Sequence, residues 1–130
     1  MKILIVDDSK TIRRVLTKSI TNALKDTKIE FFEAGDGQAG LDILKDNLDV
    51  DFVFLDVNMP IMGGEQMLYI MRNSPDMIDI KVVMQTTEGV RTKVTKLTRM
   101  GVSGYLLKPY THETIATLME KLLSTEEVTA

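Results

Sequence analysis

The stretch Phe-Val-Phe-Leu-Asp at residues 52–56 decides the fold, together with Ile-Leu-Ile-Val-Asp-Asp at residues 3–8. Each begins with four consecutive apolar residues, a pattern typical of a strand buried on both faces of a parallel sheet. Residues 52–56 end in the acidic residue Asp56, and residues 3–8 end in two acidic residues, Asp7 and Asp8. Because the carboxyl ends of parallel strands meet at one edge of an open sheet, we expect these three carboxylates to lie close together.

Three carboxylates at one sheet edge predict a bound cation. Like charges a few ångströms apart raise each other's pKa, so all three acids stay ionised only if positive charge is supplied. Carboxylate oxygens are hard ligands of the kind that Mg²⁺ prefers. An Asp-Asp pair is also common as a solvated helix cap, and taken alone Asp7-Asp8 fits either interpretation.

The rest of the chain alternates strands with helices, recognised by buried apolar runs and by apolar residues at helical spacing. The predicted strands are residues 2–7, 28–34, 52–55, 80–84 and 102–107. The predicted helices lie at residues 10–25, 39–48, 67–71, 90–100 and 115–122. Strands that alternate with helices of this length favour parallel pairing and right-handed crossovers. We therefore expect an α/β fold with helices on both faces of the sheet.

Length and composition exclude several classes of protein. The chain has 130 residues, no cysteine and a formal net charge of −3 at pH 7. The length suits one domain, expected at residues 1–124 with a short tail at residues 125–130. The lack of cysteine excludes disulfides, thiolate metal sites and cysteine nucleophiles. The first apolar run is too short for a signal peptide or a membrane span, so we expect a cytoplasmic protein. The negative net charge disfavours direct binding to nucleic acid.

Four motifs stand in order at the ends of four predicted strands. They are Val6-Asp7-Asp8-Ser9 with Arg13-Arg14, Phe54-Leu55-Asp56-Val57-Asn58-Met59-Pro60 with Gly63-Gly64, Met84-Gln85-Thr86, and Gly104-Tyr105-Leu106-Leu107-Lys108-Pro109. Each motif alone is weak, but the ordered set is specific, and over nearly its whole length the chain resembles the response regulator receiver domains. The resemblance implies a flavodoxin-like fold, with a five-stranded parallel sheet in the order 2-1-3-4-5 and five helices on its two faces.

By this resemblance, Asp56 is the phosphoacceptor of a two-component system and a sensor histidine kinase is the phosphodonor. Mg²⁺, or Mn²⁺ in its place, would bind Asp8, Asp56 and the backbone carbonyl of Asn58, with Asp7 acting through water. Lys108 would contact a phosphoryl oxygen as a point charge. Neutralisation of this kind is what attack of a carboxylate on phosphorus requires.

The resemblance also assigns residues to switching and to hydrolysis. Thr86 would bind the phosphoryl group in the active state while Tyr105 rotates inward, and the surface of the fourth helix, fifth strand and fifth helix would bind a downstream target. Asn58 and Glu88 occupy positions that tune hydrolysis. Thr87 lies directly after the switch residue, where the family usually has a smaller side chain, and could narrow access to the site.

Further features concern single residues or short segments. The resemblance implies a cis peptide bond between Lys108 and Pro109. Gln85 is a polar residue in a strand that should be buried, for which a hydrogen bond at the strand end is the one explanation. His112 is the single histidine and is expected to face solvent, so the phosphodonor histidine must belong to another protein. A basic segment at residues 91–99 is either a solvated helix or part of the target surface, for which we expect an acidic or amphipathic partner segment with Tyr105 near the centre of the surface.

The alternatives for the function differ in chemistry. The resemblance favours a signalling protein of chemotaxis and flagellar motor control, which catalyses only its own phosphorylation and slow dephosphorylation and on which a phosphatase could act. A phosphorelay intermediate is the alternative within the family. A metal-dependent phosphohydrolase usually has a second acid where this chain has Asn58. A flavodoxin-like cofactor binder needs a phosphate-cradling loop after the first strand, where Asp7 and Asp8 would repel phosphate.

Overall fold

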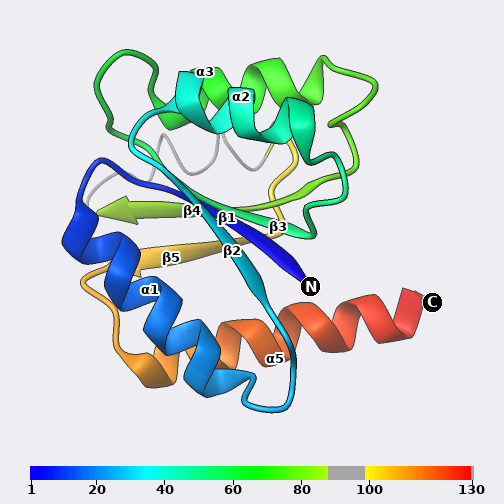
Figure 1. Cartoon of the computed structure of the whole chain (residues 1–130). Coiled ribbons are helices and arrows are strands. Elements are labelled where there is room, and N and C mark those ends of the chain that lie inside the picture. The colour runs from blue at the N-terminus through cyan, green and yellow to red at the C-terminus, as the bar shows by residue number, and fades with distance from the viewer. Residues whose placement is uncertain (88–98, 130) are drawn as a thin grey trace.

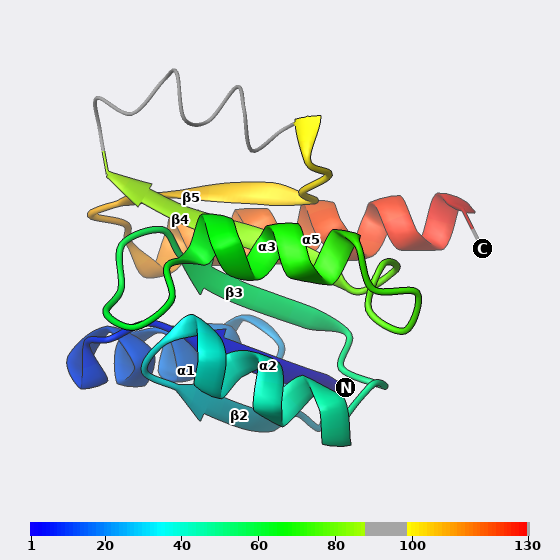
Figure 2. The same ribbon diagram turned by 90° about the horizontal axis from the view of Figure 1, so that it is seen from above.

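The computed structural model describes the backbone of residues 1–87 and 99–129 and the side chains up to residue 124. Five strands within these residues form one parallel sheet in the order β2-β1-β3-β4-β5, which confirms the predicted topology (Figure 2). The strands are β1 (Lys2–Val6), β2 (Glu30–Ala34), β3 (Phe52–Asp56), β4 (Lys81–Thr87) and β5 (Gly104–Lys108). The strands that end in the predicted acids, β1 and β3, are therefore neighbours.

Helices cover both faces of the sheet (Figure 1). On one face lie α1 (Lys10–Ala23) and α5 (His112–Thr129), and on the other lie α2 (Gly37–Asp46) and α3 (Gly64–Arg72). Five helices were expected and four lie in the described residues, because the helix predicted at 90–100 falls almost entirely on residues 88–98, outside them. No helix in the described part of the chain combines the length and apolarity that crossing a membrane requires.

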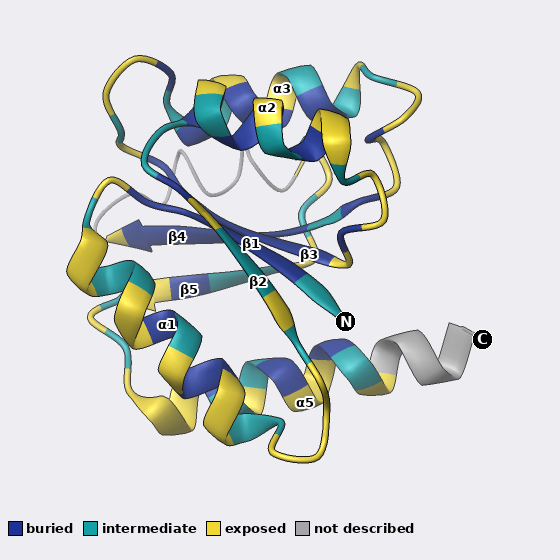
Figure 3. Cartoon of the chain, viewed as in Figure 1, coloured by how far each residue is buried: buried dark blue, intermediate teal, exposed yellow. Residues whose placement is uncertain are grey.

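The core consists of two apolar layers, one on each side of the sheet. Alternate residues of β3 face opposite layers: Phe52 and Phe54 pack toward α1 and α5, and Val53 and Leu55 pack toward α2 and α3. Figure 3 shows the central strands as buried over almost their whole length. Burial of a side chain of this size contributes about 1.5–3 kcal/mol relative to exposure. The core thus fixes β1 and β3 side by side and aligns their ends.

Local signals set the helix boundaries. Ser9 caps α1, its side-chain oxygen accepting a hydrogen bond from the N–H of Ile12 at 3.2 Å. Asp36 caps α2 in the same way through the N–H of Ala39 at 2.8 Å. The first helix was predicted to reach residue 25 but ends at Ala23, because the chain turns there and the N–H of residue 27 bonds back to the carbonyl of residue 24.

Candidate functional site

The acids at the ends of β1 and β3 meet at one edge of the sheet. One carboxylate oxygen each from Asp7, Asp8 and Asp56 lies within 4.8 Å of the others. Asp7 and Asp56 are buried, with 0% and 7% of their surface exposed, whereas Asp8 is exposed. In the described residues, this is the one group of three potential metal-ligating acids, histidines or cysteines. The structure therefore brings together the three carboxylates that were predicted to meet.

Lys108 reaches this acid cluster (Asp7, Asp8 and Asp56) from β5. Its Nζ lies 2.9 Å from Oδ2 of Asp7 and 3.2 Å from Oδ1 of Asp56. Because β4 lies between β5 and β3, the lysine side chain has to cross the end of β4 to make these contacts. Oδ1 of Asp56 also accepts a hydrogen bond from the N–H of Val57 at 3.0 Å. Among donors in the described residues, none bonds Oδ2 of Asp56, which leaves that oxygen for a ligand.

Burial and neighbouring charges shift the pKa values of Asp56 and Lys108, and for each group some of these effects oppose others. Burial raises the pKa of the Asp56 carboxyl above its ordinary value, and the charge of Asp7 raises it further, although Lys108 acts in the opposite direction. Burial lowers the pKa of the Lys108 ammonium, but the hydrogen bond to Asp7 and the charges of Asp56 and Asp7 outweigh burial and leave the pKa above its ordinary value. Lys108 therefore stays charged at neutral pH and partly neutralises the acid cluster.

The donor set suits a hard divalent cation. All three side chains of the acid cluster are carboxylates, the ligands that Mg²⁺ and Mn²⁺ accept. The exposure of Asp8 leaves room for water, which Mg²⁺ retains in most protein sites. The three acids can therefore hold a divalent metal.

The loop after β3 is packed closely against Asp56. α3 begins at Gly64, where a Cβ would lie 2.1 Å from the backbone carbonyl oxygen of Asp56. In the same loop Ile61 has a φ of 66° and is 83% exposed, an unusual conformation for a β-branched residue. The sequence indicated a loop here but neither of these features, since both depend on how the loop packs against β3.

The proposed switch residues lie on β4 and β5. Thr86 is 4% exposed at the end of β4. Tyr105 of β5 is half-buried and packs against the apolar layer that faces α2 and α3. Thr87 is exposed and pairs in register with Lys108. Glu88 and residues 91–98 of the basic segment lie outside the described residues.

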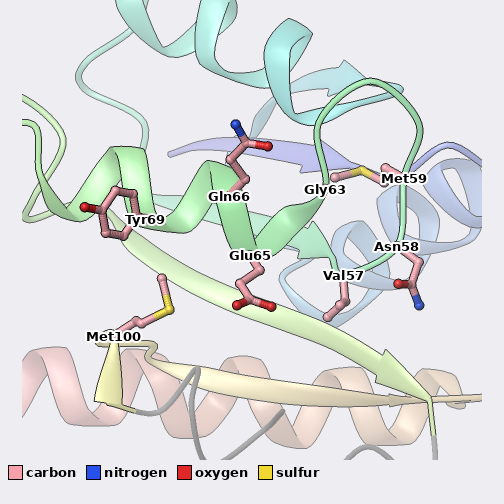
Figure 4. A pocket seen from close by; sticks show the side chains of 8 residues that line it. All are labelled: Val57, Asn58, Met59, Gly63, Glu65, Gln66, Tyr69 and Met100. Carbon is pink, nitrogen blue, oxygen red and sulfur yellow. The ribbon is translucent and has the colours of Figure 1, made fainter.

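A cleft of about 770 Å³ opens beside the acid cluster. Figure 4 shows that its walls come from the loop after β3, from α3 and from Met100. The described lining residues are Val57, Asn58, Met59, Gly63, Glu65, Gln66, Tyr69 and Met100. Asn58 is exposed here, two residues beyond Asp56. None of the three acids is among these lining residues, so the cleft adjoins the acid cluster without containing it.

Several further contacts surround the site. The hydroxyl of Tyr110 donates a hydrogen bond of 3.0 Å to Oε1 of the fully buried Gln85. The polar residue in a buried strand was visible in the sequence, but its partner was not. The Lys108–Pro109 peptide bond is cis. His112 is exposed at the start of α5, and its ring forms a hydrogen bond with the hydroxyl of Ser19 of α1.

Comparison with known proteins identifies the family. Residues 3–120 match the response regulator receiver domain. The chain is 34% identical to a chemotaxis protein CheY homolog of Campylobacter jejuni over 125 residues, which is 96% of this chain and 94% of that protein. It is 42% identical to chemotaxis protein CheY-3 of Vibrio cholerae over 123 residues, 94% of this chain and 88% of that protein. The chain therefore belongs to the response regulator receiver domain family, the signalling domains of two-component systems.

Solved structures agree with this assignment. The chemotaxis response regulator CheY4 of Vibrio cholerae superposes with a TM-score of 0.81 at 29% identity, covering 93% of this chain and 97% of that one. The REC domain of AraT, a response regulator from Geobacillus stearothermophilus, gives a TM-score of 0.84 at 26% identity, covering 98% of this chain and 96% of that one. The protein is thus a response regulator, a signalling protein.

Proposed function

We propose that this receiver domain takes a phosphoryl group from a sensor histidine kinase onto Asp56 and thereby changes its affinity for a downstream partner. The observation that carries the proposal is the position of Lys108, whose Nζ contacts two buried carboxylates on strands that are not its neighbours. A lysine that spans a strand to reach Asp7 and Asp56 places a positive charge where a phosphoryl group on Asp56 would carry negative charge.

The reaction forms an acyl phosphate. Oδ2 of Asp56 attacks phosphorus and an O–P bond forms while the P–N bond of the donor phosphohistidine breaks. The donor imidazole, already protonated on its other ring nitrogen, takes the electron pair of the broken bond and leaves as neutral imidazole. The two hydrogen bonds to Oδ1 hold the carboxylate in place during the attack. Lys108 contacts a phosphoryl oxygen and stabilises its charge. Hydrolysis of the same bond returns Asp56 to its free form.

The metal is the second source of positive charge. Asp8, Asp56 and the backbone carbonyl of Asn58 would hold Mg²⁺, or Mn²⁺ in its place, with Asp7 acting through water. When bound, the metal supplies neutralisation of the phosphoryl oxygens. Asp56 carries a pKa raised by burial and by Asp7, so a cation beside it favours the ionised, nucleophilic form.

The response to phosphorylation rests on β4 and β5. We assign Thr86 to the phosphoryl group and Tyr105 to the switch, and we place the target on the surface that includes β5 and α5. Asn58, Thr87 and Glu88 are assigned to the rate of hydrolysis. Because the relatives named above are chemotaxis proteins, we place this domain in chemotaxis, with a component of the flagellar motor as the target and a phosphatase as a further partner.

Treatment with phosphoramidate or acetyl phosphate, followed by measurement of the intact mass, tests the proposal. We expect a gain of one phosphoryl group, about 80 Da, that requires Mg²⁺ and is lost on treatment with hydroxylamine, as acyl phosphates are. Asp56→Asn should abolish the gain, and the exposed Asp42→Asn should leave it unchanged. Equal labelling of Asp56→Asn would refute the assignment of the phosphoacceptor.

A further inference from the structure

Gln85 and Tyr110 form a buried polar contact that the proposed chemistry does not use. Gln85 is 0% exposed, and its Oε1 accepts the hydrogen bond from the Tyr110 hydroxyl. Its Nε2 is the one buried side-chain nitrogen or oxygen without a hydrogen-bond partner in the described part of the chain. A buried donor without a partner costs stability, so packing alone does not account for a glutamine at this position.

The position of Gln85 connects it to the site. In the sheet, Gln85 pairs in register with Asp56 of β3 and with Leu106 of β5. Phe54 and Leu106 both pack into the layer toward α1 and α5. Because side chains alternate along a strand, Asp56, Gln85 and Lys108 point to this same face of the sheet on three adjacent strands. Lys108 itself pairs in register with Thr87, so its side chain reaches Asp56, the residue level with Gln85, from a position two residues further along the sheet.

Tyr110 comes from the chain that directly follows Lys108. It lies two residues beyond the lysine and packs against the apolar layer of α1 and α5. Burial raises the pKa of the Tyr110 hydroxyl well above its ordinary value, and the charges of Asp7 and Asp56 raise it further. The hydroxyl therefore keeps its proton at neutral pH and acts as the donor to Gln85.

We propose that Gln85 and Tyr110 are positioning residues for Lys108: their hydrogen bond ties the chain after β5 to β4 and so fixes the base from which the lysine reaches Asp7 and Asp56. This inference rests on the proposed phosphorylation of Asp56. It differs from a general role in stability, because Lys108 contacts the phosphoryl group whereas the metal is held by the acids. Loss of the hydrogen bond should therefore slow phosphorylation without weakening metal binding.

The test compares two measurements on the same variants, the rate constant of phosphorylation by phosphoramidate and the dissociation constant of Mg²⁺ from calorimetry. Tyr110→Phe should lower the rate constant about three- to tenfold, the usual effect of one neutral hydrogen bond, and leave the Mg²⁺ dissociation constant within about twofold. The matched control is Tyr69→Phe on the exposed face of α3, which should change neither quantity. A fall in metal affinity parallel to the fall in rate would overturn the inference, as would an unchanged rate.

Two further variants complete the test. The double variant Gln85→Leu with Tyr110→Phe replaces the polar pair by an apolar pair and leaves no buried polar group without a partner, so it should fold. It should still be phosphorylated more slowly than the wild type. A wild-type rate constant would overturn the inference. In a Lys108→Met background, Tyr110→Phe should lower the phosphorylation rate constant by less than about 1.5-fold more. The effects of residues that act through one another are not additive. Failure of the wild-type protein to be labelled at all would instead refute the proposed function.

Discussion

Replacement of Lys108 by methionine removes the positive charge that lies between two buried carboxylates. Methionine keeps most of the aliphatic length of lysine, so the change is mainly electrostatic. Asp7 and Asp56 are then left close together with 0% and 7% exposure and without the ammonium that contacts both. The free energy of unfolding should therefore fall when no divalent metal is present.

The size of the loss follows from the burial of the three groups. Removing one partner of a fully buried ion pair costs about 3–5 kcal/mol. Here the Lys108 side chain is 20% exposed and Asp8 keeps the site open to water, so screening reduces the loss to about 2–3 kcal/mol. The matched control is Lys45→Met, which removes an exposed pair with Asp42 and should cost no more than about 0.5 kcal/mol.

The loss depends on pH in a defined direction. The pKa of Lys108 is raised in the folded protein, so its contribution is fully present below the lysine pKa of the unfolded chain and is lost only as the pH rises through the folded value. The pKa of Asp56 is also raised, so this carboxyl takes up a proton early as the pH falls. The difference between wild type and Lys108→Met should therefore be large at pH 7.5 and shrink toward pH 4.

Urea unfolding followed by circular dichroism in the presence of EDTA measures this difference. Added Mg²⁺ should stabilise Lys108→Met more than the wild type, since the cation takes over neutralisation of Asp7 and Asp56. The reasoning would be refuted if Lys108→Met were as stable as Lys45→Met at pH 7.5, or if the difference from wild type widened as the pH fell.

Three more substitutions test the loop and the end of α3 by thermal or urea unfolding. Gly64→Ala should lower the free energy of unfolding by about 3 kcal/mol and slow phosphorylation, because the added Cβ would strike the Asp56 carbonyl. In the control Gly35→Ala, the added Cβ meets only an ordinary contact at 3.9 Å, so this change should be tolerated. Equal losses in the two variants would contradict this reasoning. Ile61→Asn should raise the free energy of unfolding by about 0.5–1 kcal/mol, because asparagine adopts a positive φ with less strain than isoleucine. A lower free energy of unfolding would argue against strain at this position. Arg72→Lys should lose about 2 kcal/mol, because the guanidinium bonds four backbone carbonyls; full stability would show those bonds to be dispensable.

The residues of the site that could be predicted from the sequence are those at the ends of strands. Apolar runs closed by acids identify parallel strands, and parallel pairing alone brings Asp7, Asp8 and Asp56 to one edge. Neither spacing nor periodicity places Lys108, whose contact with the acids depends on β5 lying beyond β4. That strand order was implied by family resemblance and confirmed by the sheet.

Contacts between side chains from distant segments were not predictable. Gln85 stood out as a polar residue in a buried strand, but nothing in the sequence identified Tyr110 as its partner across 25 positions. The close contact of Gly64 with Asp56 and the positive φ of Ile61 likewise depend on the packed path of one loop. Such features follow from tertiary packing, which local residue patterns do not encode.

Chemical mapping of the phosphorylated residue tests the central claim most directly. Borohydride reduces an aspartyl phosphate to homoserine, and peptide mass spectrometry then locates the modified position. We expect homoserine at position 56 after treatment with phosphoramidate and Mg²⁺, and none when the metal is chelated. Homoserine at another acid, or equal conversion of position 56 without any divalent metal, would contradict the account.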